Sequence, residues 1–353
     1  MSATKTFGLL LVTGAIWGAG CHSGDMQTKT PAAPPAAAAT TRPLVGGVER
    51  LDPALDALVA ADARPEVLAH GYKWSEGPVW TGGALLFSDV PDNVIWRWSE
   101  SDGAREFLRP SGYTGSVPRG GEPGSNGLAV DEAGRLHMCQ HGDRRVARLA
   151  PDGRSFETVA DRHDGKRFNS PNDVVVRPNG DVYFTDPIYG LVGHEKDPAR
   201  EIPWSGVYCA RAGGGVDLLD KTLPYPNGLA FSPDGKTLYV AVSDPARAIW
   251  MAYDVDAGGG VSNGRVFFDA TSFVKAGKKG LPDGMKVDVD GNLFATGPGG
   301  VFVFTPAGEH LGTIVTGEPT ANCAFGDDGR TLYMTANDKL TRIRLKTRGA
   351  VGK

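Results

Sequence analysis

Six oxygen-bearing side chains recur along the chain, each directly before a similar short apolar segment. They are Glu76, Asn126, Asn172, Asn227, Asp283 and Asn322. Carboxylate and amide oxygens are the ligands that hard divalent cations such as Ca²⁺ prefer, and a typical zinc site would use His or Cys instead. The pattern therefore predicts one bound divalent cation, with calcium first and magnesium, manganese or zinc as alternatives. Taken singly, Asn and Asp are also ordinary turn residues, so the functional interpretation depends on the sixfold repetition.

The elements that must position these side chains are six similar hairpins. Most of their turns contain Asp-Gly or Asn-Gly, the strongest short-range hairpin signal. The hairpins cover residues 78–89, 127–138, 173–184, 228–239, 284–295 and 323–334. A repeat of about 50 residues is typical of a four-stranded propeller blade. The sequence therefore predicts an all-β fold, a six-bladed β-propeller whose innermost strands bring equivalent positions together in a central metal-binding funnel.

The ends of the repeat region predict how the ring closes. The run 66–72 is expected to form a strand that pairs with the C-terminal run 340–345, which leaves no open sheet edge. Residues 51–60 are expected to form a short helix ahead of the propeller. Two long irregular loops, 110–124 and 189–204, are expected at the mouth of the funnel and would select the substrate.

The N-terminal region is predicted to direct export. Lys5 precedes an apolar run and then Cys21, which is typical of a signal peptide. Small residues before Cys21 favour a lipoprotein cleavage site, with an ordinary signal peptide as the alternative. The expected location is the periplasm, with membrane contact only through a lipid on Cys21. The predicted organisation is a signal peptide over 1–21, a Pro/Ala/Thr-rich tether over 22–50 and the propeller over 51–350.

Composition limits the partners that this chain can have. The 353 residues are 41% hydrophobic and carry a formal net charge of -4. Because there is no basic block, nucleic acid is not an expected partner. If Cys21 carries a lipid, an odd number of cysteines remains, namely Cys139, Cys209 and Cys323. This number disfavours a disulfide framework, and the three are expected to be small buried residues.

Several ordered motifs resemble those of a known family, the senescence marker protein/gluconolactonase/luciferin-regenerating-enzyme family, in its gluconolactonase-like branch. The motifs are Ser-Glu-Gly-Pro-Val-Trp at 75–80, Asn-Ser-Pro-Asn-Asp-Val-Val at 169–175, Pro-Asn-Gly-Leu-Ala-Phe-Ser at 226–232 and Pro-Asp-Gly-Met at 282–285. The resemblance covers about residues 65–345. It implies a six-bladed propeller with a divalent metal held by Glu76, Asn172, Asn227 and Asp283, and it implies that Asp283 is the catalytic acid/base. One departure is Gln140, where relatives often have Glu.

The leading hypothesis from this resemblance is hydrolysis of a sugar lactone to the aldonic acid, with the metal as Lewis acid. Asn126 and Asn172 would bind sugar hydroxyls, while His141 and Tyr189 would line the rim of the funnel. A serine hydrolase is disfavoured because the sequence has no Gly-x-Ser-x-Gly motif. Two alternatives stay open. One is a metal-dependent esterase of the paraoxonase or diisopropyl-fluorophosphatase type, and the other is a non-catalytic propeller that binds sugar or protein.

Overall fold

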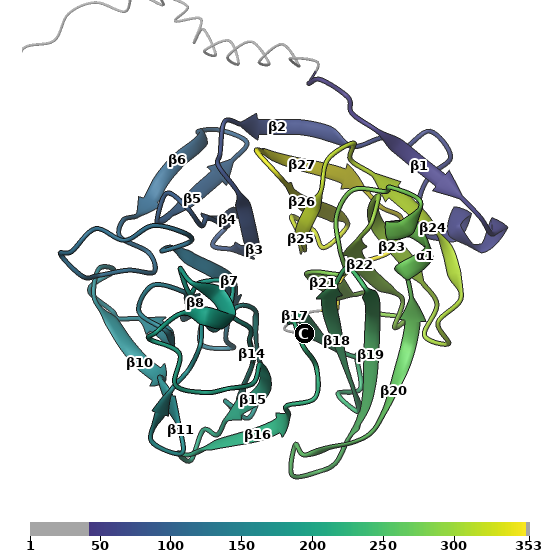
Figure 1. Cartoon of the computed structure of the whole chain (residues 1–353). Coiled ribbons are helices and arrows are strands. Elements are labelled where there is room, and N and C mark those ends of the chain that lie inside the picture. The colour runs from purple at the N-terminus through teal and green to yellow at the C-terminus, as the bar shows by residue number, and fades with distance from the viewer. Residues whose placement is uncertain (1–41, 351–353) are drawn as a thin grey trace, which may run out of the picture. The chain divides into compact units, whose positions relative to one another are not determined.

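The computed structural model describes residues 42–350, and these form six antiparallel sheets arranged around a central axis (Figure 1). The prediction of a six-bladed β-propeller is confirmed. The predicted signal peptide, Cys21 and most of the predicted tether lie outside the described residues, so export and lipidation stay predictions. Between residues 42 and 350, no helix is both long and apolar enough to cross a bilayer.

The first three blades each contain four strands in simple up-and-down order. Blade 1 consists of β3 (Ser75–Thr81), β4 (Ala84–Asp89), β5 (Val94–Ser99) and β6 (Gly103–Leu108). Blade 2 consists of β7 (Ser125–Val130), β8 (Leu136–Gln140), β9 (Arg145–Leu149) and β10 (Phe156–Ala160). Blade 3 consists of β13 (Val174–Val176), β14 (Val182–Asp186), β15 (Gly206–Ala210) and β16 (Val216–Asp220).

The last three blades follow the same order, and two of them take in a strand from the start of the described chain. Blade 4 consists of β17 (Pro226–Phe231), β18 (Thr237–Asp244), β19 (Arg247–Val255) and β20 (Val261–Asp269). Blade 5 consists of β21 (Met285–Val287), β22 (Leu293–Gly297), β23 (Gly300–Phe304), β24 (His310–Val315) and β1 (Gly47–Arg50). Blade 6 consists of β25 (Thr320–Gly326), β26 (Thr331–Ala336), β27 (Lys339–Arg344) and β2 (Glu66–His70).

The remaining elements are short and lie between blades. They are the hairpin β11 (Arg162–His163) and β12 (Lys166–Arg167), the 3-10 helices η1 (Pro53–Ala57) and η2 (His194–Lys196), and the helix α1 (Thr271–Lys275). η1 lies inside the helix predicted over 51–60. It begins where the Asp52 side chain accepts a hydrogen bond from the backbone N–H of Ala54 at 2.8 Å.

The ring closes as the sequence predicts. β2 pairs antiparallel with β27, so that one strand from the start of the propeller completes the blade at its end. β1 pairs with β24 in the same way, from Gly47 opposite Val315 to Arg50 opposite Gly312. The predicted tether of 22–50 therefore extends too far, because residues 47–50 cover the edge of blade 5 that would otherwise stay open.

Apolar side chains between neighbouring blades hold the ring together. In blades 4 and 5, for example, Trp250 is fully buried and its ring lies 5.3 Å from that of Phe302 and 5.4 Å from that of Phe304. Replacing such a core Trp by Ala typically costs about 3–5 kcal/mol. The cysteines Cys139, Cys209 and Cys323 are free and buried, as expected.

Candidate metal-binding active site

The six repeated oxygen-bearing residues lie where the innermost strands begin. Glu76, Asn126, Asn227 and Asn322 are in the first three residues of β3, β7, β17 and β25, whereas Asn172 and Asp283 lie two residues before β13 and β21. Each innermost strand contacts the innermost strands of both neighbouring blades. Figure 1 shows these strands around the central axis. We call the six residues the oxygen ring.

Direct backbone contacts link successive members of this ring. The N–H of Gly127 donates to the carbonyl oxygen of Asn172 at 2.7 Å, and the N–H of Gly284 donates to that of Ala321 at 2.8 Å. Four of the six ring residues are followed by Gly, and the space beside these glycines is small. A Cβ atom on Gly77 would lie 2.1 Å from the carbonyl oxygen of Asn126, which no side chain can tolerate. Glycine therefore lets the starts of adjacent blades touch.

Asp173 follows Asn172 where a glycine is usual and makes a link of its own. Its carboxylate accepts hydrogen bonds from the backbone N–H of Val174 at 3.0 Å and from that of Leu229, on blade 4, at 3.2 Å. The side chain is buried. Asp173 thus joins two blades and also places a further negative charge beside the oxygen ring.

The electrostatics of the ring favour a cation. Burial raises the pKa of the Glu76 carboxyl, and the negative charges of Asp173 and Glu122 raise it further. Burial also raises the pKa of the Asp283 carboxyl well above its ordinary value, with the charge of Glu76 as the next cause. Two buried carboxylates that oppose each other's ionisation must retain a proton or gain a positive partner.

Several oxygen atoms of the ring are free to bind that partner. The Oδ1 atoms of Asn172 and Asp283 are buried and have no hydrogen-bond partner among residues 42–350. The Nδ2 atom of Asn227 donates to Ser243 Oγ at 3.0 Å, which leaves its Oδ1 as the available atom. Glu76 uses only Oε2 to accept from the Gly77 N–H, at 2.8 Å. These four residues are the predicted metal ligands, and their oxygens suit a hard divalent cation.

Asn322 differs from these four residues. Its Oδ1 accepts a hydrogen bond from the Cys323 N–H at 2.9 Å, and its side chain lies near enough to Glu76 to lower the pKa of that carboxyl against the larger effect of burial. Asn322 therefore supports a ligand rather than supplying one. Within the described part of the chain, no group of three or more His, Cys, Asp or Glu side chains could hold a metal ion. A set of two carboxylates and two amides remains as the candidate.

The polar atoms of the predicted rim residues, His141 and Tyr189, are buried rather than exposed at the funnel mouth. His141 is fully buried, and neither ring nitrogen has a hydrogen-bond partner among the described residues. The buried Tyr189 hydroxyl lies near Ser243 and Asp283, and burial raises its pKa. Asn126 is buried in β7. Unpartnered polar atoms beside a candidate metal site are available to a substrate.

Glu122 belongs to the same cluster, although it is not one of the residues predicted from the sequence. Its Oε2 lies 3.4 Å from His141 Nδ1. It also contributes to the raised pKa values of Glu76, Asp283 and Tyr189. Glu122 lies in the predicted mouth loop 110–124, and only its place in that loop could have pointed to it.

Two buried side chains fix the loops around the site. Asp186 accepts hydrogen bonds from the N–H groups of Asn169 and Ser170, both at 2.8 Å, and so holds the segment that leads to Asn172. Burial raises the pKa of Asp186 to about 7. Gln140 donates to the Ser111 carbonyl at 2.8 Å. An ionised Glu at position 140 could not donate, so the departure to Gln holds the mouth loop.

Comparison with known proteins places this site in a family. Residues 74–338 match the family model described as the SMP-30/Gluconolactonase/LRE-like region. The chain is 41% identical over 312 residues to a gluconolactonase of Zymomonas mobilis, covering 86% of this chain and 88% of the relative. It is 27% identical over 268 residues to a pentonolactonase of Haloferax volcanii, covering 74% and 80%.

A solved structure agrees with these sequence comparisons. The gluconolactonase of Xanthomonas campestris superposes on this chain with a TM-score of 0.74 at 30% sequence identity. The superposition covers 87% of this chain and 98% of that one. The span matched by the family model, residues 74–338, contains all six positions of the oxygen ring.

Proposed function

The chain belongs to the SMP-30/gluconolactonase/LRE-like family, and we propose that it hydrolyses sugar lactones with one divalent cation held by Glu76, Asn172, Asn227 and Asp283. It is a lactone-hydrolysing enzyme of this family. We further propose that calcium is the preferred cation and that Asp283 is the catalytic acid/base. Its product would be an aldonic acid.

One observation carries the metal proposal. The Oδ1 atoms of Asn172 and Asp283 are buried without a hydrogen-bond partner among residues 42–350, beside a second carboxylate, Glu76. Buried polar atoms without partners are costly, and two carboxylates there repel each other. A bound divalent cation satisfies both atoms and offsets both charges. This support comes from the donor set alone.

The proposed reaction assigns a proton transfer to Asp283. A divalent cation, when bound, supplies a Lewis acid that polarises an ester carbonyl. Asp283 would accept a proton from the attacking water as the bond between the water oxygen and the carbonyl carbon forms. The same carboxyl returns the proton to the ring oxygen as that oxygen leaves, so the bond between the carbonyl carbon and the ring oxygen breaks.

The remaining residues of the cluster orient the sugar. Asn126 and Asn172 would hydrogen-bond hydroxyl groups, and the unpartnered nitrogens of His141 and the hydroxyl of Tyr189 offer further contacts. Glu122, whose Oε2 lies 3.4 Å from His141 Nδ1 without a hydrogen bond, adds a carboxylate to the same cluster. A lactone that presents several hydroxyls matches this lining better than a purely apolar ester does.

A lactone panel tests the proposal. The metal-stripped protein is mixed in weak buffer with gluconolactone, a pentonolactone, an aryl ester and an organophosphate, and acid release is followed above the spontaneous rate. We expect acid release from the lactones only after Ca²⁺ or another divalent ion is added, with loss on chelation. Full turnover in excess chelator would refute the metal dependence. Faster aryl-ester or organophosphate hydrolysis would favour the esterase alternative, and metal binding without turnover would favour a binding module.

A further inference from the structure

A second cavity lies in the central channel, at the end of the innermost strands away from the oxygen ring. Its volume is about 530 Å³, within the range of about 300–1,000 Å³ typical of small-molecule pockets. On each innermost strand, its lining residues come two or more positions after the ring residue. With a rise of about 3.3 Å per residue, the lining begins about 7 Å along the axis. We call this space the distal cavity.

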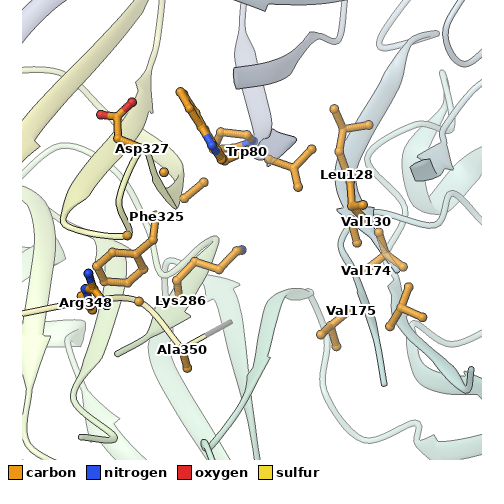
Figure 2. A pocket seen from close by; sticks show the side chains of 18 of the residues that line it. Trp80, Leu128, Val130, Val174, Val175, Lys286, Phe325, Asp327, Arg348 and Ala350 are labelled. Carbon is orange, nitrogen blue, oxygen red and sulfur yellow. The ribbon is translucent and has the colours of Figure 1, made fainter. Parts of the chain in front are cut away.

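The walls of the distal cavity are mostly apolar. Six of the side chains that form them are Trp80, Leu128, Val130, Val174, Val175 and Phe325. Figure 2 shows Trp80 and Phe325 on one side of the space and Leu128, Val130, Val174 and Val175 on the other. An apolar lining of this size lowers the free energy of a hydrocarbon group that enters it from water.

One cation points into this apolar space. Lys286 is half-buried in β21, and Figure 2 shows its side chain extending from the wall toward the middle of the cavity. Its Nζ donates to the carbonyl oxygen of Met285 at 2.9 Å, which uses one of the three donors of an ammonium group. No carboxylate among residues 42–350 lies within the 4.0 Å that defines an ion pair with it. Its nearest negative neighbour is the buried Asp173 carboxyl, whose pKa is raised by burial and lowered by the Lys286 charge.

Among the other charges at the cavity, one cation and one carboxylate have no ion pair in the described part of the chain. Arg348 is exposed at the edge and has no ion pair among the described residues. Asp328 is neutralised by Arg344 at the distance of a salt bridge. Asp327 accepts hydrogen bonds from the Tyr333 hydroxyl at 3.1 Å. A ligand carboxylate at Lys286 would make the direct ion pair that no carboxylate among the described residues makes with it.

From these contacts we infer that the distal cavity binds a small amphipathic carboxylate, with its carboxylate on the Lys286 ammonium and its hydrocarbon chain along the apolar walls. This binding is separate from lactone hydrolysis, because the two sites lie at opposite ends of the innermost strands. The ligand class follows from charge complementarity at Lys286 and from the apolar lining. A medium-length unbranched chain is compatible with the cavity volume of about 530 Å³.

Calorimetric titration of the full chain tests this inference, with hexanoate, octanoate, decanoate and decyltrimethylammonium as probes. Decanoate is expected to bind with one site per chain. Octanoate should bind about 15-fold more weakly, because each methylene group contributes about 0.8 kcal/mol, or nearly fourfold. Decyltrimethylammonium, which has the same tail and the opposite charge, should bind at least about tenfold more weakly than decanoate, as expected for loss of a charged hydrogen bond.

Substitutions of single lysines test whether decanoate binds at Lys286. Lys286→Met should weaken decanoate binding about tenfold or more, whereas Lys236→Met, an exposed lysine in the turn between β17 and β18, should leave it unchanged. If the Met variant does not fold, Lys286→Gln keeps a donor for the Met285 carbonyl and gives the same readout. Equal binding of the anionic and cationic probes, or unchanged binding in a folded Lys286 variant, would overturn the inference.

A truncation of the residues that follow Ala350 provides one more test. Ala350 lines the cavity, and three residues follow it in the sequence. If a chain that ends at Ala350 binds decanoate and the full chain does not, the cavity belongs to those residues and the inference is wrong. Equal binding by both chains supports it. The titration needs neither metal nor lactone, so its outcome is independent of the proposed hydrolysis.

Discussion

Replacing Glu76 by Gln should change calcium affinity and metal-free stability in opposite directions. Gln has nearly the same shape and can still accept the Gly77 N–H, which now donates to Glu76 Oε2 at 2.8 Å. The substitution removes one negative charge from a buried cluster in which Asp173 and Asp283 are the neighbours. Without metal, this charge opposes folding, and with metal it attracts the cation.

The size of each effect follows from the composition of the site. Losing one partner of a buried charged contact costs about 2–5 kcal/mol, which is about 30- to 4,000-fold in affinity at 1.4 kcal/mol per tenfold. Because Glu76 supplies half of the formal charge of the four ligands, we expect calcium to bind about 100-fold or more weakly. Removing an unpaired buried charge should raise the metal-free stability by about 1–4 kcal/mol. Each kcal/mol raises Tm by about 2–4 °C.

The dependence on pH has a definite sign. The folded-state pKa of Glu76 is raised above its ordinary value of 4.5, so the folded protein binds this proton more tightly than the unfolded chain. The contribution to stability is complete below the unfolded pKa and is lost as pH rises toward the folded pKa. Metal-free wild type should therefore lose stability relative to Glu76→Gln as pH rises above 4.5.

Calorimetric Tm measurements from pH 4.5 to 9, with chelator and with a calcium titration, check both effects. Glu132→Gln is the matched control, because Glu132 is exposed in the turn between β7 and β8. Its Tm should follow wild type under every condition. The same calcium-induced rise in Tm in Glu76→Gln as in wild type would contradict a ligand role for Glu76. An equally steep fall of the metal-free Tm with rising pH in the variant would contradict a raised pKa of Glu76.

Further substitutions separate chemistry, binding and folding. Asp283→Asn should lower kcat by about 10²–10⁴-fold or more, the contribution of a general base, with an unchanged circular dichroism spectrum; wild-type turnover would exclude Asp283 from this role. His141→Ala should raise KM about tenfold through a lost hydrogen bond and leave the calcium-induced Tm shift unchanged; loss of that shift would make His141 part of the metal site. In Gly284→Val, the new Cβ would lie 1.9 Å from the Cγ of Asn322, so urea unfolding should show a loss of about 3 kcal/mol, and wild-type stability would contradict the close approach. Removing the residues up to the end of β2 leaves β27 with an open edge, so the shortened chain should aggregate on refolding, and a monomeric, fully active product would show that this closure is dispensable.

The repeated hairpin patterns were sufficient to predict the fold. Asp-Gly and Asn-Gly turns between apolar runs specify hairpins through local backbone preferences, and six copies about one blade apart define the ring. The closing strand 66–72 and its C-terminal partner 340–345 could also be predicted, because a propeller needs its open edge paired. The boundary at residue 51 could not, since the pairing of 47–50 with β24 is a long-range contact without a local pattern.

Some residues of the candidate site could be predicted from the sequence, and others could not. Equivalent positions in a repeat must occupy equivalent places, so Glu76, Asn172, Asn227 and Asp283 could be selected from spacing and family resemblance. The sequence did not show that the Asn322 side chain lies beside Glu76. Nor did it show that Glu122, from an irregular loop, lies 3.4 Å from His141 Nδ1. Both depend on how side chains from different blades orient toward one another.

The distal cavity shows most clearly what only tertiary structure decides. The sequence pattern around each of its apolar residues predicts only an ordinary strand, and nothing near Lys286 in the sequence distinguishes it from other lysines. Strand periodicity determines which residues alternate across a sheet, and this information is local. The free volume between six strands, and the single ammonium group that enters it, result from the packing of blades whose residues are far apart in the chain.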